Sequence, residues 1–197
     1  MTGGAPLRVA VLASGSGSNL QALLDALGPK APARVTHVVS NHPDAGALER
    51  ARRAGVRTTV LQDPTNADEL LSVLADADLV VLAGYLKLVP ARVVARFRQR
   101  TINIHPALLP AFGGPGMYGQ RVHQAVIASG ATRSGATVHY VDEHFDRGPI
   151  IAQRTVPVLP DDTAASLAHR VLAVEHELLP QVVLELATQI LKERETR

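Results

Sequence analysis

The sequence of 197 residues contains no cysteine, and this absence excludes several kinds of chemistry. A thiol nucleophile, a disulfide framework and a zinc or iron–sulfur site with thiolate ligands all require that residue. Aromatic residues are scarce, at 3% of the chain, and all six fall between positions 85 and 145. This distribution is not that of a stacking platform for nucleic-acid bases.

Strong charge of either sign is also missing, because 20 basic residues stand against 18 acidic ones for a net charge of +2. The densest basic group, Arg92, Arg96, Arg98 and Arg100, is typical of the solvated side of a helix and a following turn. The longest apolar runs, such as 79–83, are too short to cross a bilayer, and no charged-then-apolar leader begins the chain. We therefore expect a soluble, unprocessed protein that binds neither nucleic acid nor membrane, with the cytoplasm as its default location.

The remaining composition is that of a globular chain of about one domain, and such a chain buries roughly 70% of its unfolded surface. Short valine-rich runs alternate with helix-like segments, which predicts an α/β fold: a Rossmann-like, mostly parallel β-sheet with helices on both faces. The predicted strands are 7–13, 35–40, 57–61, 79–83, 101–104, 136–141 and 150–158. The predicted helices are 18–27, 45–54, 68–75, a short one opened by Pro90, 121–128 and a region from about 163 that Pro180 should kink or split.

Residues 106–119 form an exception to this alternation, since they hold three of the 13 prolines and four of the 15 glycines. A loop of this length in a compact domain is more often a binding segment or lid than filler, although a disordered connector is the alternative. The Leu109–Pro110 bond is a candidate cis peptide in this tight loop.

Residues 13–19, ASGSGSN, follow the first predicted strand and precede the first predicted helix. Glycines let backbone N–H groups approach an oxyanion, and a helix N-terminus adds partial positive charge. The dinucleotide fingerprint is incomplete, because Leu20 stands where a third small residue belongs and Asn41 replaces the acid that would bind ribose. The segment is therefore either a site for a phosphate monoester or a plain tight turn, with Ser18 or Asn19 capping the helix.

The segment 101–106, TINIHP, places Asn103 and His105 on one face of a strand, because side chains alternate along it. Both would emerge at the carboxyl end of the sheet, where ligands bind in open α/β folds. An asparagine N–H can stabilise an oxyanion, and a histidine can donate a hydrogen bond or a proton. A satisfied structural histidine is the alternative.

Residues 139–149 crowd three carboxylates and two histidines into a predicted turn. The segment has no recognised metal-ligand spacing, so we expect no metal. Two interpretations stay open: an ordinary solvated hairpin turn, or a carboxylate that faces His105 and raises the pKa of that histidine as an orienting partner of a base.

Together these residues resemble the glycinamide ribonucleotide formyltransferases of purine synthesis over nearly the whole chain. The resemblance begins with VAVLASGSGSNLQ at 9–21 and extends to Glu175 and His176. Its most specific parts are LAGYLK at 82–87, NIHPALLP at 103–110 and FDRGPII at 145–151. It implies the formyltransferase fold and transfer of a formyl group from 10-formyltetrahydrofolate to a primary amine on a ribonucleotide, without a metal.

The resemblance also implies roles for individual residues. Gly17, Ser18 and Asn19 would hold the 5′-phosphate of the ribonucleotide, and Glu175 would accept hydrogen bonds from its ribose. The catalytic residues would be three: Asn103 and protonated His105 to stabilise the oxyanion, and Asp146 to keep His105 charged and to relay a proton.

The folate would lie along Leu86, Lys87, Leu88 and Val89, near Asn103, and against the loop from Asp142 to Asp146. Lys87 would contact its acidic tail. An arginine that many family members place before the 79–83 strand is missing here, and Asn66 or Asp68 stands in that neighbourhood.

We expect residues 1–197 to form one formyltransferase domain, as a monomer or homodimer. The part up to about residue 100 would bind the substrate phosphate, and the part from about 101 would carry the catalytic residues and much of the folate site. Two related enzymes are alternatives, a formyltetrahydrofolate deformylase and a methionyl-tRNA formyltransferase, but each carries an extra domain that a chain of this length does not accommodate. A non-catalytic module that binds nucleotide or folate is a further alternative.

Overall fold

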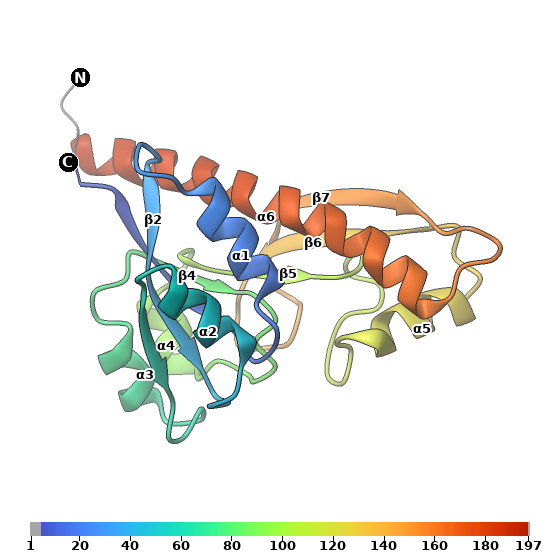
Figure 1. The fold of residues 1–197 in the computed structure, drawn as a ribbon, viewed down its shortest axis with the longest axis horizontal. Helices are drawn as coiled ribbons and strands as arrows, with labels where there is room; N and C mark the ends of the chain where they lie inside the picture. The colour runs from blue at the N-terminus through green and yellow to red at the C-terminus, as the bar shows by residue number, and fades with distance from the viewer. Residues whose placement is uncertain (1–4, 197) are drawn as a thin grey trace.

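The computed structural model describes residues 5–196, and its centre is one seven-stranded sheet (Figure 1). The strand order is β3-β2-β1-β4-β5-β6-β7. The strands are β1 (Leu7–Leu12), β2 (Ala33–Ser40), β3 (Arg57–Val60), β4 (Leu79–Leu82), β5 (Thr101–His105), β6 (Arg133–Tyr140) and β7 (Ile150–Pro157). The first five run parallel, whereas β6 and β7 are antiparallel to their neighbours. The predicted mostly parallel sheet is therefore confirmed.

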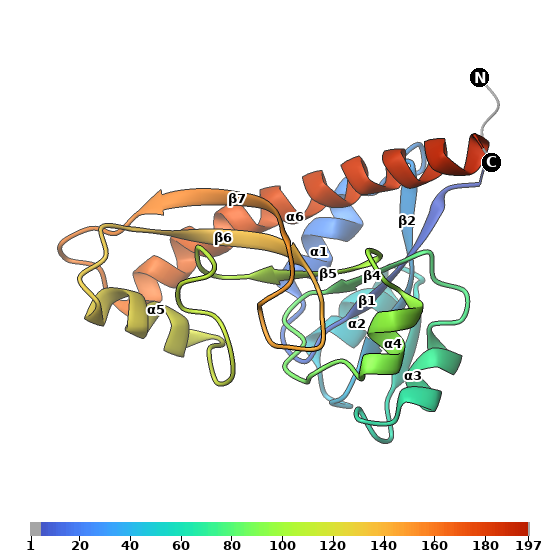
Figure 2. The same ribbon diagram turned by 180° about the vertical axis from the view of Figure 1, so that it is seen from behind.

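Helices cover both faces of this sheet, as the sequence predicts. They are α1 (Ser18–Ala26), α2 (Gly46–Arg53), α3 (Ala67–Val73), α4 (Ala91–Arg96), α5 (Gln120–Ala128) and α6 (Ala164–Glu195). One buried cluster packs α1, α2, α5 and α6 against the sheet. A second cluster packs α3 and α4 against the opposite face, which Figure 2 shows toward the viewer.

The last helix, α6, runs the length of the molecule as one element of 32 residues with Pro180 inside it (Figure 1). Pro180 was expected to kink or split this region, and the continuous helix contradicts the split. Proline removes one backbone hydrogen bond, but Leu179 before it and Val183 after it are both fully buried against the sheet. A break would pull one half of the helix out of the core, so packing holds the helix continuous.

The carboxyl ends of the parallel strands carry the loops that build the site. Ser14, after β1, donates its hydroxyl to Asn41 Oδ1 at 2.6 Å and accepts the backbone N–H of Leu86 at 3.0 Å. These bonds tie together the segments that follow β1, β2 and β4. Asn41, which stands where dinucleotide enzymes have a ribose-binding acid, thus accepts a hydrogen bond that holds the segments after β1 and β2 together.

The segment 106–119 contains neither helix nor strand, as predicted, and the Leu109–Pro110 peptide bond is cis. It is anchored at several points, since Leu109 N donates to the buried Thr137 hydroxyl and Gly114 N donates to Asp146 Oδ2. The segment is therefore a structured wall of the site, which disfavours the interpretation as a disordered connector.

Asp78 fastens the start of the sheet to the end of α6, because its carboxylate accepts from both Arg8 and Arg194. Burial works against its charge, yet these bonds lower the pKa of Asp78 to about 2. A carboxyl whose pKa is lower in the folded than in the unfolded protein stabilises the fold above its unfolded pKa. That stabilisation is lost as the pH falls through about 2.

We predict that Asp78→Asn lowers the free energy of unfolding at pH 7 by about 1 to 2 kcal/mol, a value discounted for the solvent around the two arginines. Urea unfolding from pH 7 to pH 2 measures the effect, and the difference from the native protein should shrink toward pH 2. Asp76→Asn is the matched control, because Asp76 is exposed and 3.9 Å from its only ion-pair partner within residues 5–196. An equal loss in both variants would contradict the assignment.

Candidate active site

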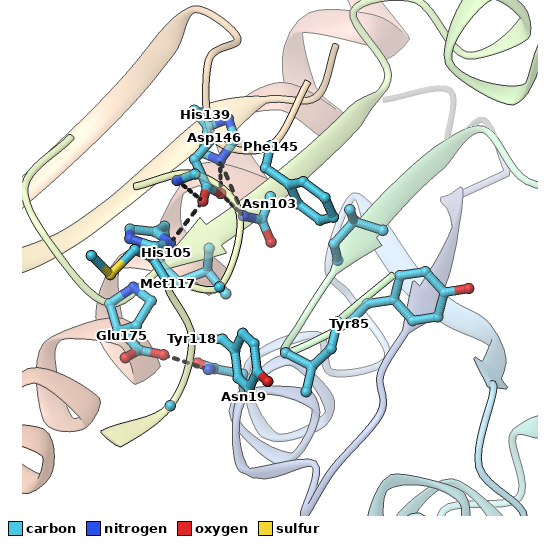
Figure 3. Close-up of a pocket in the computed structure, with 18 of the residues that line it drawn as sticks. Asn19, Tyr85, Asn103, His105, Met117, Tyr118, His139, Phe145, Asp146 and Glu175 are labelled. Atoms are coloured by element: carbon cyan, nitrogen blue, oxygen red, sulfur yellow. Dashed lines mark hydrogen bonds and ion pairs between the residues drawn. The ribbon is translucent and has the colours of Figure 1, made fainter. Parts of the chain in front are cut away.

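A cavity of about 620 Å³ opens at the carboxyl ends of β1, β4 and β5. Its wall includes Asn19 after β1, the segment from Gly84 to Val89 after β4, and Asn103 with His105 on β5. Asp146 and Glu175 complete it from the β6–β7 connection and from α6. Most of the residues predicted from separate parts of the sequence are thus brought to one place (Figure 3), but Gly17, Ser18 and Asp142 are not among the lining residues.

Within the ASGSGSN segment at 13–19, Gly17 is the N-cap of α1 and has φ +76°. A Cβ on Gly17 would lie 2.6 Å from the backbone of Ala47, so this position requires glycine. The expected capping by Ser18 or Asn19 is wrong, since the N-cap makes no side-chain hydrogen bond. The first N–H groups of α1 therefore lack a side-chain cap, an arrangement suited to an anion.

Asn19 turns toward α6 instead, and its Nδ2 donates to Glu175 Oε2 at 2.6 Å (Figure 3). Both side chains are buried, and Asn19 Oδ1 has no hydrogen-bond partner among the described residues. Burial raises the pKa of Glu175 to about 7, against the opposing effect of the bond from Asn19. A group that donates hydrogen bonds, such as a sugar hydroxyl, would satisfy these oxygens.

Asn103, His105 and Asp146 meet on the opposite wall of the cavity. Asp146 Oδ2 lies 3.5 Å from His105 Nδ1, and Asp146 Oδ1 accepts from Asn103 Nδ2 at 3.3 Å. The backbone of Asp146 adopts φ +57°, an uncommon conformation that aspartate tolerates, and the N–H of Gly114 binds its Oδ2 at 2.9 Å. The predicted pairing of a carboxylate with His105 is present.

The expected rise in the pKa of His105 is nevertheless wrong. Burial lowers this pKa and the Asp146 carboxylate only partly opposes the effect, so the net direction is downward. The Nε2 of His105 lies 2.8 Å from the carbonyl oxygen of Phe112, which can only accept, and Nε2 therefore carries a proton. Burial also works to raise the pKa of Asp146, but hydrogen bonds and the adjacent imidazoles hold it below its usual value.

The expected folate-binding residues follow β4. Leu86 and Leu88 are 47% and 43% exposed and line the cavity with Lys87, whereas Val89 is buried. Asp142 was expected here, but it is not among the lining residues, and its carboxylate accepts the backbone N–H of His144. Exposed leucines beside polar groups give this end of the cavity an apolar wall that suits a flat ring.

Neither residue that stands where the family arginine is missing is poised to bind a ligand. Asn66 caps α3 by accepting from the backbone N–H groups of Asp68 and Glu69. Asp68 instead pairs with Arg92 at 2.9 Å. In this arrangement, Lys87 is the basic residue that lines the cavity on this side.

Comparison with known proteins identifies the family of this chain. A family model described as formyl transferase matches residues 7–183. The chain belongs to the formyl transferase family. It is 46% identical over 187 residues to a chloroplastic phosphoribosylglycinamide formyltransferase of Vigna unguiculata, an alignment that covers 89% of this chain and 59% of that protein.

A second formyl transferase, the phosphoribosylglycinamide formyltransferase of Haemophilus influenzae, is 36% identical, and the alignment covers 89% of this chain and 85% of that one. The crystal structure of glycinamide ribonucleotide transformylase 1 from Symbiobacterium toebii superposes with a TM-score of 0.86 at 41% identity. The superposition covers 93% of this chain and 89% of the Symbiobacterium chain. The formyltransferase fold expected from the sequence is thus confirmed.

Within this family fold, the sequence interpretation missed some of the site. His139 was noted only as part of a titratable segment, although it is the cross-strand partner of Asn103. His123 and Tyr118, from α5 and the loop before it, also line the cavity. Their spacing carries no recognisable motif, so only the folded chain reveals them.

Two further features bear on ligands and location. Among residues 5–196, no cluster of three or more histidine, aspartate or glutamate side chains is arranged to hold a metal ion. No helix in the described part of the chain has the length and apolar character needed to cross a membrane.

Glu175 provides a test of the electrostatics of this site. Its pKa is about 7 when folded and 4.5 ordinarily, so the folded protein binds the proton more tightly than the unfolded chain. Stability from this group is therefore fully present below about pH 4.5 and is lost as the pH rises through about 7.

We predict that Glu175→Gln raises the free energy of unfolding of the ligand-free protein by about 1 to 3 kcal/mol at pH 8, with no difference at pH 4.5. Gln keeps an acceptor for Asn19 but carries no charge. Urea unfolding across this range measures the effect, with the exposed Glu185→Gln on the same helix as control. A difference that does not vary with pH would refute the assignment.

Proposed function

We propose that the protein transfers the formyl group of 10-formyltetrahydrofolate to the primary amine of 5′-phosphoribosylglycinamide, a step of purine biosynthesis. The observation that carries the proposal is the meeting of Asn103, His105 and Asp146 in a cavity whose other side presents an uncapped helix start. The names of the Vigna, Haemophilus and Symbiobacterium relatives support it. A cavity of about 620 Å³ is also within the range that small ligands fill.

The ribonucleotide would lie between α1 and α6. Backbone N–H groups at Gly17, Ser18 and Asn19 would bind its phosphate, and the buried Asn19–Glu175 pair would face its ribose. The amine would then point toward His105 on the opposite wall. The folate would lie along Leu86 to Val89, with its ring on the exposed leucines and its acidic tail toward Lys87.

The chemistry joins the amine nitrogen to the formyl carbon and breaks the bond from that carbon to folate N10. The carbonyl oxygen becomes an oxyanion in between, and the amine proton ends on N10. The N–H of Asn103 would stabilise the oxyanion, the positive charge of His105 would add to this once that ring holds the proton, and no metal is needed for that. Asp146, which contacts both side chains, would orient them and relay the proton directly or through water.

The lowered pKa of His105 bears on this step. A histidine that is reluctant to hold a second proton releases it readily, which suits a group that takes a proton from the amine and passes it on. The Asp146 carboxylate at 3.5 Å would stabilise the imidazolium while it exists. We infer that the ligand-free enzyme holds His105 neutral and that the reaction charges it transiently.

We further propose that the chain acts as one domain, with residues up to about 100 binding the phosphate and residues from about 101 carrying the catalytic groups. Its partners are the two small-molecule substrates, and its state is monomer or homodimer. We propose a cytoplasmic location, although the name of the Vigna relative places that protein in the chloroplast.

The deciding assay follows 10-formyltetrahydrofolate by absorbance with and without the ribonucleotide. Formyl transfer that requires the ribonucleotide supports the proposal. Release of tetrahydrofolate and formate without it would favour the hydrolase alternative, and binding without turnover would favour a non-catalytic module.

We predict that His105→Ala and Asp146→Asn each lower kcat by roughly 10²-fold or more, because each removes a group that acts on the oxyanion or the proton. The two losses should not add, since the groups act together. Steady-state kinetics give kcat, and calorimetry gives the affinity for the ribonucleotide, which should stay within a few-fold of the native value. Full turnover by either variant would end the catalytic assignment.

We predict that Gly17→Val weakens ribonucleotide binding by roughly tenfold or more. Its side chain would strain a residue at φ +76° and push against Ala47, so the backbone N–H groups would leave the phosphate. Gly28→Ala, beyond the other end of α1, is the control, because a Cβ there meets nothing within 4 Å. Unchanged affinity in calorimetry would reject the phosphate site.

A further inference from the structure

His139 belongs to the site but has no role in the mechanism above. It lies on β6 directly opposite Asn103 on β5, and its side chain is 2% exposed. The pairing of β6 with β7 shifts register between Val138 and His139. The ring sits behind Asn103 and Asp146 as seen from the cavity (Figure 3).

The hydrogen bonds of this ring define which nitrogen carries the proton. Nδ1 lies 2.8 Å from the carbonyl oxygen of Tyr140, an atom that can only accept, so Nδ1 must donate. Nε2 lies 3.0 Å from Nδ2 of Asn103, an atom that can only donate, so Nε2 must accept. Both contacts are satisfied together only by a neutral ring with its proton on Nδ1.

This ring in turn decides the orientation of the Asn103 amide. With Nε2 as acceptor, the amide nitrogen faces His139, and its second N–H points to Asp146 Oδ1 at 3.3 Å. Rotating the amide by 180° would set its carbonyl oxygen against the Nε2 lone pair and against a carboxylate oxygen. Two buried acceptor-to-acceptor contacts make that orientation costly.

We propose that His139 is a positioning residue for formyl transfer: its neutral Nδ1–H ring holds the amide nitrogen of Asn103 beside Asp146, so that the amide offers an N–H, not its carbonyl, to the formyl oxygen. The inference rests on the proposed function for its catalytic consequence. Of the two hydrogen bonds of the Asn103 amide nitrogen, the one to Asp146 is longer than the one to His139. The N–H that faces Asp146 is therefore the one that can leave its partner and donate to the oxyanion.

A competing arrangement would make His139 the ion-pair partner of Asp146, since Nε2 lies 3.6 Å from Oδ1. A proton on Nε2 would then point between Asp146 and the amide nitrogen of Asn103, two donors would face each other at 3.0 Å, and the amide would have to rotate. The two arrangements differ in where the proton sits, which a measurement can decide.

The first test compares His139→Leu with His139→Gln. Leucine removes the acceptor, whereas glutamine can place its carbonyl oxygen near the position of Nε2. We expect His139→Leu to lower kcat by roughly 10- to 100-fold, less than the full loss of an oxyanion donor, with KM for both substrates nearly unchanged. His139→Gln should recover most of that loss. Equal losses in both variants, or a loss carried by KM, would overturn the inference.

The second test asks whether His139 acts through Asn103. If it does, adding His139→Leu to Asn103→Ala should lower kcat no further than Asn103→Ala alone. Losses that multiply would show an independent role and overturn the inference. Thermal unfolding of each variant accompanies the kinetics, and a test on the native protein decides the inference even where the leucine variant fails to fold.

The third test needs no turnover. Long-range ¹H–¹⁵N correlation spectra of the native protein at neutral pH distinguish the Nδ1–H ring, the Nε2–H ring and the imidazolium. We expect the Nδ1–H form, and either other form overturns the inference. A native protein without formyl transfer would instead overturn the proposed function, while transfer by His139→Leu at the native rate would overturn the role of His139 alone.

Discussion

The carboxylate of Asp146 is the group on which the arrangement of the site depends. Its two oxygens are contacted by His105 from β5, by Asn103 from the same strand and by the N–H of Gly114 from the 106–119 loop. The loop packs so closely that a Cβ on Gly113 would lie 3.1 Å from that of Asp146. One carboxylate, with its side chain 10% exposed, thus connects a strand, a hairpin connection and a wall of the cavity, which explains why an uncommon backbone conformation persists at Asp146.

Burial shifts the pKa values of the ionisable groups of the site in opposite directions, lowering that of His105 and raising that of Glu175, and this gives the groups different roles. It favours the neutral form of His105 and of Glu175, whereas hydrogen bonding keeps Asp146 ionised. As a result, the ionised Asp146 lies beside His105, which readily gives up a proton. Glu175, on the other wall, has a pKa of about 7. A proton relay needs such unequal partners, because two groups with the same preference would compete for the proton.

The sequence allows the fold and the identities of the main side chains to be predicted because both depend on local patterns. Alternating apolar runs mark the sheet, and the period of two places Asn103 and His105 together. The structure departs from the sequence predictions where contacts between residues far apart in the sequence determine the local conformation. Glu175, 156 positions away, takes the side chain of Asn19 and leaves Gly17 to begin α1, and packing on both sides of Pro180 overrides its tendency to break α6. The orientation imposed by His139 depends on strand pairing and had no local signal.

Within residues 5–196, the ligand-free site contains polar groups that lack hydrogen-bond partners, and ligand binding would account for them. Asn19 Oδ1 is buried without a hydrogen-bond partner in the described chain, the start of α1 has no side-chain cap, and Glu175 is held near neutrality by burial. Each feature costs stability, and each would be satisfied by a ligand that brings a phosphate and donor hydroxyls. A protein selected for stability alone would cap the helix and replace the buried carboxyl. Under the proposed function this arrangement is complementary to a sugar phosphate, and binding would recover the cost in stability.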